Sequence, residues 1–180
     1  MRSLSAFAIL ALFASSTIAA DVVYKDRNGA ELPPIAELAK KTGDAAKGAT
    51  SFAPFCGICH QINGAGVDFG PNMSDVGARK TKENILESIL NPNAVIEPGF
   101  QAEMIKLESD EVAMGIISAE TDTEVTVKAM GGAKTTLKKA DIVSRTKQAN
   151  SMMPPGLHAA FTTEELVNVA EYLFSLKAKK

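Results

Sequence analysis

The chain has 180 residues, a length that suits one domain with a targeting segment or an insertion, so we expect a single core. It carries 19 basic and 21 acidic residues, and this balance argues against a nucleic-acid-binding protein, which would show a clear basic excess. Aromatic residues make up 6% of the chain and Trp is absent, so a buried prosthetic group would supply apolar volume that the side chains lack.

The first residues have the pattern of a secretory signal peptide. Met1-Arg2 precedes an apolar run from Leu4 to Phe13, and small residues follow as far as Ala19-Ala20. We expect cleavage near Ala19-Ala20, which removes residues 1–20 and leaves a periplasmic chain. An uncleaved N-terminal anchor is the alternative. No later segment approaches the roughly 20 apolar residues of a membrane-spanning helix, so we expect no transmembrane segment in the mature chain.

The mature chain begins with a polar leader and then a helix. Residues 21–42 contain turn signals and predict a loose leader with a short strand at Val22–Tyr24. Asp44 is a suitable N-cap for a helix that runs to Phe55. Apolar and small residues recur there at helical spacing, namely Ala45, Gly48, Phe52 and Phe55.

A glycine-rich loop and a second helix follow. Residues 61–78 contain four glycines and predict a long ordered loop. Thr81 then caps a helix that ends at Asn91-Pro92. One face of this helix is apolar and is formed by Ile85, Leu86, Ile89 and Leu90.

The periodicity changes from helical to alternating over about residues 100–145, which predicts four or five short antiparallel strands. We expect these strands to form a β insert outside the main site. The spacing Thr162 to Glu165 then matches a capping box, and an apolar stripe that ends at Leu176 predicts a terminal helix.

The motif Cys56-Gly57-Ile58-Cys59-His60 carries the chemistry of the sequence. Two thiols at this spacing can each bond one vinyl group of a single haem, and the next residue, His60, is then held beneath the iron. Cys56 and Cys59 are the only cysteines, and the signal segment fits export to the compartment where haem is attached. A redox-active dithiol or disulfide and a zinc site remain as alternatives. A zinc site would need further ligands, and His158 is the only other histidine.

The residues around this motif resemble the class I cytochrome c pattern. The resemblance lies in Gly48-x3-Phe52-x3-Cys56-x2-Cys59-His60, Gly70-Pro71-Asn72-Met73, a late Met-Pro and Tyr172 in the terminal helix. More closely, the order of Asn91-Pro92-Asn93, a β-rich insert and Ser151-Met152-Met153-Pro154-x-Gly156-Leu157 is similar to the haem-binding domain common in planctomycete and verrucomicrobial proteins. That domain is often fused to larger dehydrogenase-like modules, which are absent from this sequence.

The resemblance implies a fold, a cofactor and roles for individual residues. It implies a mainly α, cytochrome c-like fold around one covalent haem c, with a small antiparallel β insert between the third helix and the Met-Pro loop. The cytochrome c domain would span residues 43–180. Gly48 would let the first and last helices approach closely near Tyr172, and the Pro71 carbonyl would accept the His60 Nδ1 proton.

Several residues could supply the sixth iron ligand. Met153 is the first candidate, since Pro154 restricts its backbone to an extended conformation and the resemblance points to the same residue. Met152, His158 or no protein ligand remain open. The other methionines fit core packing better, and they are Met73, Met104, Met114 and Met130.

These patterns favour an electron carrier rather than an enzyme. We expect His60 and Met153 to ligate the iron, and electrons to pass from a periplasmic dehydrogenase to an oxidase, another cytochrome or another acceptor. A peroxidase and a haem-based gas sensor are the alternatives, and both need an open or displaceable coordination position. The insert could serve as a docking surface, a haem shield or a spacer.

Overall fold

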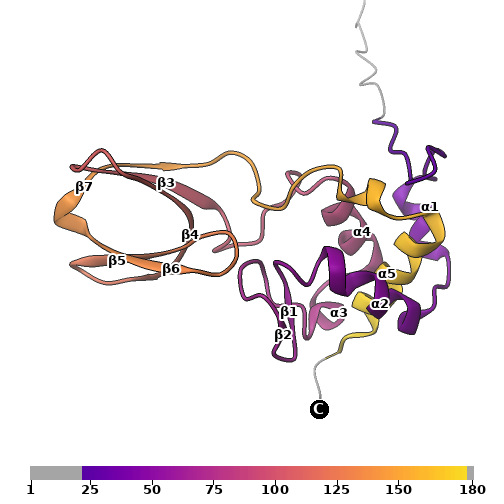
Figure 1. Cartoon of the computed structure of the whole chain (residues 1–180). Coiled ribbons are helices and arrows are strands. Elements are labelled where there is room, and N and C mark those ends of the chain that lie inside the picture. Colours follow the sequence, from indigo (N-terminus) through magenta and orange to yellow (C-terminus); the bar gives the residue numbers. More distant parts are fainter. Residues whose placement is uncertain (1–21, 178–180) are drawn as a thin grey trace, which may run out of the picture.

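The computed structural model describes residues 22–177 and shows a helical part beside a curved antiparallel sheet (Figure 1). The expected signal peptide, residues 1–20, lies outside the described residues. The helices are α1 (Ile35–Lys40), α2 (Ala45–Phe55), α3 (Val76–Arg79), α4 (Lys82–Leu90) and α5 (Thr163–Ser175). The strands are β1 (Gln61–Ile62), β2 (Ala65–Gly66), β3 (Ala102–Leu107), β4 (Val112–Glu120), β5 (Glu124–Lys128), β6 (Lys134–Lys138) and β7 (Ile142–Lys147). Among residues 22–177, no helix has the length and apolar character to cross a membrane.

The expected mainly α class is wrong. Helix accounts for 32% of the described residues and strand for 24%, and β3 to β7 form a five-stranded sheet in the order β6-β5-β4-β3-β7. The alternating pattern does form strands as predicted, and the last of them extends to Lys147. The fold combines a helical part with an antiparallel sheet because the insert is large enough to build a complete sheet of its own.

The predicted helices are present with their predicted caps. The Asp44 side chain accepts hydrogen bonds from the amides of Ala46 and Lys47 at the start of α2. Thr81 and Thr162 form capping boxes at the starts of α4 and α5. These caps satisfy amides that a helix start leaves unpaired, and so fix where the three helices begin.

Helices α2 and α5 cross at a point where a glycine removes the side chain between them. A Cβ placed on Gly48 would lie 2.0 Å from the Asn168 carbonyl oxygen and 2.8 Å from Tyr172 Cβ. The close approach predicted near Tyr172 is therefore present. The Asp44 amide also donates to Asn168 Oδ1 at 2.7 Å, which ties the start of α2 to the middle of α5.

The leader is ordered, which corrects the expectation of a loose segment with a strand at Val22–Tyr24. The segment forms α1, in which Leu38 is fully buried, and a single β-bridge joins Lys25 to Glu31. The Asp26 carboxylate accepts hydrogen bonds from the Thr163 amide and hydroxyl at 3.0 Å each. Because α1 has only six residues, periodicity gives little signal for it.

The sheet has a concave apolar face, so the described chain contains two apolar clusters instead of the expected single core. The larger cluster lies among the helices, and Leu86, Leu166 and Val169 are among its fully buried members. The smaller cluster consists of Ile105, Val125 and Val127 with partly buried neighbours. Bulges in β4 and between β3 and β7 bend the sheet, and this curvature encloses the second cluster.

Candidate functional site

The motif residues lie on the turn that ends α2. Cys56 is the C-cap residue, and its amide donates to the Phe52 carbonyl at 2.8 Å. The Cys59 and His60 amides both donate to the Cys56 carbonyl, at 3.0 and 2.8 Å. A single tight turn therefore holds the two thiols and the imidazole in a fixed order after the helix.

Both thiols are free and neutral. Burial raises the pKa of Cys56 to about 12, with a further increase from the neighbouring Cys59, and burial also raises the pKa of Cys59. A redox-active dithiol requires the opposite shift, because its attacking thiol must ionise near neutral pH. The zinc alternative also lacks ligands, since residues 22–177 contain no group of three or more His, Cys, Asp or Glu side chains placed to hold a metal ion.

His60 has one ring nitrogen in a hydrogen bond and the other free for a ligand role. Its Nδ1 lies 2.8 Å from the Pro71 carbonyl oxygen, which fixes the tautomer with the proton on Nδ1. Burial lowers the pKa of His60, and the Pro71 hydrogen bond opposes this shift. The ring is thus a neutral imidazole with Nε2 available as an electron-pair donor.

The loop after the motif folds back onto it. The Phe69 and Gly70 amides both donate to the Cys59 carbonyl, at 3.2 and 2.7 Å. A Cβ on Gly70 would lie 2.6 Å from His60 Cε1, so the missing side chain leaves space for the ring. Sequence reasoning placed Gly70 in a family pattern but did not identify this contact, because glycine spacing alone does not show which residue approaches it.

Apolar surface is exposed directly beside the thiols. Phe55 is 38% exposed, and Ile58, which stands between the two cysteines, is 60% exposed. Phe55 also packs edge-on against the buried Phe161, at 5.1 Å between ring centroids. A flat apolar group bonded to the thiols would cover this surface.

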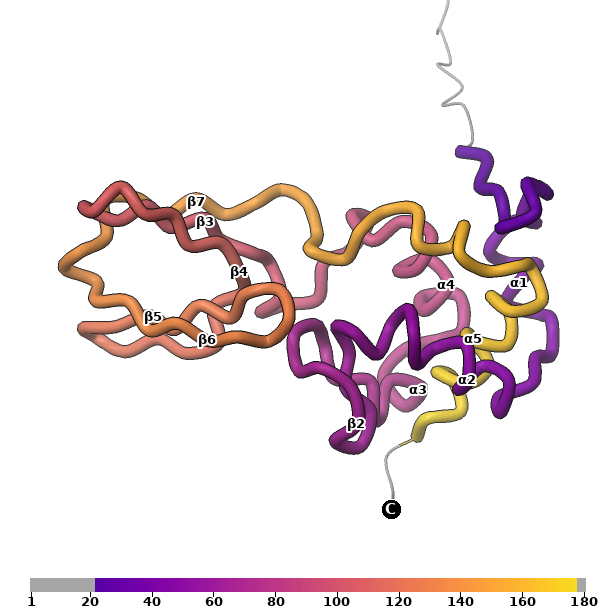
Figure 2. The backbone as a smooth tube through the Cα atoms, viewed as in Figure 1, coloured from indigo at the N-terminus to yellow at the C-terminus, as the bar shows by residue number. Residues whose placement is uncertain are grey.

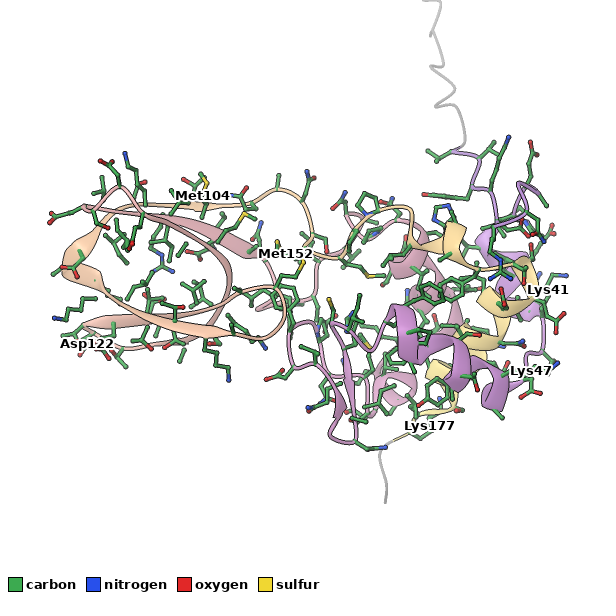
Figure 3. The ribbon with its side chains drawn as sticks, in the orientation of Figure 1. Lys41, Lys47, Met104, Asp122, Met152 and Lys177 are labelled. Atoms are coloured by element: carbon green, nitrogen blue, oxygen red, sulfur yellow. The ribbon has the colours of Figure 1, made fainter. Side chains whose placement is uncertain are left out.

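The two methionines of the Met-Pro segment have different surroundings. Met153 is half-buried and packs against the helical apolar cluster, whereas Met152 is also half-buried but is not among the residues of that cluster. Figure 3 shows Met152 on the connection between the sheet and the helices. The segment is anchored by a hydrogen bond of 2.8 Å from the Ser151 amide to Asn93 Oδ1, and by one of 3.1 Å from the Met153 amide to Ser151 Oγ.

His158, the other histidine, packs against the leader. Its ring meets Tyr24 edge-on, with 5.1 Å between ring centroids, and it is 9% exposed. Its Nδ1 has no hydrogen-bond partner among the described residues, and burial lowers its pKa. His158 is therefore a neutral packing residue in this arrangement.

The remaining methionines divide between the two parts of the molecule. Met73 is partly buried and packs against the helical cluster, as expected for core packing. Met104, Met114 and Met130 belong to the insert and are 42%, 47% and 58% exposed. The expectation of core packing is wrong for these three, because their strand positions face outward or lie in a turn.

Part of the chain is similar to a known protein family. The family model for cytochrome c matches residues 45–115, which include α2, Cys56, Cys59, His60 and Pro71. Met153 and α5 lie outside the matched residues. The matched segment is less than half of the chain, so the match shows similarity to cytochrome c over this segment. No curated protein matches the chain.

Proposed function

We propose that this chain is a periplasmic electron carrier with one haem c attached to Cys56 and Cys59 and ligated by His60 and Met153. The cytochrome c match supports haem-based electron transfer, and implies redox partners in general. The observation that carries the residue assignment is the hydrogen bond between His60 Nδ1 and the Pro71 carbonyl, directly beside two neutral thiols. We also propose that the domain is of the planctomycete and verrucomicrobial haem-binding type.

The residues of the motif fit haem attachment. Cys56 and Cys59 would each add across one vinyl group, with the sulfur on one carbon and the thiol hydrogen on the other, so two thioether bonds form without an oxidant. Neither thiol is in a disulfide, and Ile58 and Phe55 offer apolar surface beside them. When bound, the haem supplies an iron that accepts and releases one electron.

His60 would bind the iron through Nε2. The Pro71 carbonyl holds the Nδ1 proton and thereby directs the free nitrogen outward from that hydrogen bond. Gly70 leaves room for the ring, since any side chain there would meet the imidazole. This hydrogen bond also makes the imidazole a stronger donor to the iron.

Met153 would close the sixth position. Its packing against the helical cluster and its anchored backbone support it over Met152. A position filled in both oxidation states favours electron transfer over peroxidase or gas-sensing chemistry, which needs an open site. We propose a periplasmic dehydrogenase as electron donor and a downstream oxidase or cytochrome as acceptor.

Absorption spectra of the purified protein test this proposal. The oxidised and reduced forms should both be low-spin, and the ferric form should show the weak near-infrared band of methionine ligation. The reduced protein should bind carbon monoxide slowly, and it should turn over little peroxide. A high-spin protein with rapid peroxide turnover would contradict the electron-carrier proposal.

A further inference from the structure

A buried lysine of the sheet is paired with a residue of the loop that follows the cysteine motif. Lys128 ends β5, and its Nζ lies 3.0 Å from Asp68 Oδ1. The Lys128 side chain is 8% exposed, whereas the Asp68 side chain is 57% exposed. The Lys128 side chain is mostly buried and its ion pair with Asp68 is partly buried, so the position of Asp68 is coupled to the position of β5.

The turn after Lys128 rests on the same loop. Gly132 lies in the β5–β6 turn, and a Cβ on it would lie 3.2 Å from Val67 Cγ1 and 3.5 Å from the Asp68 carbonyl oxygen. Figure 2 shows this end of the orange β5–β6 hairpin beside the loop that follows β2. The sheet therefore contacts residues 67–68 through both an ion pair and backbone packing.

Those residues lead directly to the His60 contacts. The Val67 amide donates to the Gly57 carbonyl at 2.9 Å, inside the cysteine motif. Asp68 is followed by Phe69 and Gly70, whose amides bind the Cys59 carbonyl, and then by Pro71, whose carbonyl binds His60 Nδ1. Only two residues, Phe69 and Gly70, thus separate the partner of Lys128 from the carbonyl that orients the imidazole.

We infer that Lys128 is a positioning residue for His60. The ion pair with Asp68 fixes residues 67–71 against the cysteine motif, and this fixes the Pro71 carbonyl at His60 Nδ1. The inference rests on the proposed function, in which His60 is an axial ligand. It assigns the insert a role in setting the properties of the iron, instead of the role of a spacer.

The double variant Asp68→Asn/Lys128→Met tests this inference. The double variant removes both charges together. No carboxylate or ammonium group is then left without its partner, so a change in the reduction potential cannot be caused by an unpaired charge. The loop should open more often, and exchange of the Phe69 and Gly70 amides and of the His60 Nδ1 proton should become about tenfold faster or more, as measured by NMR on the reduced protein. The reduction potential should rise, because a weaker hydrogen bond makes His60 a weaker donor.

Lys134→Met is the matched control. Lys134 pairs with Lys128 across β5 and β6 but is exposed, so its replacement removes a strand lysine without touching residues 67–71. It should leave the exchange rates and the potential unchanged. The thermal midpoint of unfolding is measured for each variant, and a large decrease would show that the sheet itself has been destabilised.

Two results would overturn the inference. Unchanged exchange of the His60 Nδ1 proton in the double variant would show that Lys128 does not act on His60. Faster exchange of the Phe69 and Gly70 amides with an unchanged reduction potential would show that the pair only attaches the insert. If the wild-type protein carried no haem, the proposed function would fail, while the His60 proton would still report whether Lys128 positions the ring.

Discussion

Gly48 in α2 and Asn168 in α5 are in backbone contact, since a Cβ on Gly48 would lie 2.0 Å from the Asn168 carbonyl oxygen. This contact brings the helix that ends in the cysteine motif directly against the terminal helix (Figure 1). The position of Cys56 therefore depends on how closely α2 and α5 approach.

Replacement of Gly48 by Ala should destabilise the protein. The added methyl would force the two helix backbones apart, and overpacking of this kind costs about 1–3 kcal/mol. Chemical denaturation of the purified protein measures the change in the free energy of unfolding. Ala49→Ser, at the next position of α2, is a control and should change stability little. An unchanged midpoint for Gly48→Ala would show that the helices can separate freely.

Replacement of Gly70 by Ala should disturb the imidazole. The new Cβ would lie 2.6 Å from His60 Cε1, so the ring must turn away from the Pro71 carbonyl. We expect a lower proportion of haem-loaded protein and an altered absorption spectrum. Gly64→Ala is the matched control, because a Cβ on Gly64 meets nothing within 4 Å, although its positive φ of 86° adds backbone strain. A wild-type spectrum for Gly70→Ala would contradict the role given to this glycine.

Met153 and Met152 provide a paired test of the sixth ligand. Met153→Ala should lower the reduction potential and speed carbon monoxide binding, because it removes the proposed thioether ligand. Met152→Ala should do neither, because Met152 does not pack against the helical cluster as Met153 does. If Met152→Ala changes these properties and Met153→Ala does not, Met152 is the sixth ligand. A response to His158→Ala alone would indicate two histidine ligands.

Acid should destabilise the insert through Glu120. Hydrogen bonds from Arg145 and Lys139 lower the pKa of Glu120 from 4.5 to about 2 in the folded protein. The contribution of ionised Glu120 to the stability of the folded protein is therefore complete above pH 4.5 and is lost as the pH falls toward 2. The thermal midpoint of the insert, followed by near-ultraviolet circular dichroism or NMR, should fall across that range. In Glu120→Gln the thermal midpoint should depend less on pH in this range. An equally steep dependence on pH in the variant would show that Glu120 does not cause the loss of stability in acid.

The helices and the cysteine motif could be predicted from sequence because their signals are local. Asp44, Thr81 and Thr162 mark helix starts within a few residues of the apolar pattern that they precede. The hydrogen bond between His60 and Pro71 was expected from the family resemblance, and the structure contains it.

Features that depend on contacts between distant residues could not be predicted in the same way. Lys128 and Asp68 are 60 positions apart, and nothing in either strand or loop composition indicates that they meet. The sheet was expected, but its curvature and its own apolar cluster follow from bulges that alternation does not reveal. The expected class, mainly α with one core, was wrong because the insert builds a five-stranded sheet with an apolar cluster of its own.

The most direct test of the proposed function is whether the purified protein carries haem through covalent bonds to Cys56 and Cys59. The purified protein should keep its pigment through denaturing electrophoresis and acidic acetone extraction, and its intact mass should exceed that of the polypeptide by one haem. Cys59→Ala should abolish or severely reduce maturation. Release of the pigment from the wild-type protein by acidic acetone, or a mass equal to that of the bare polypeptide, would contradict the account.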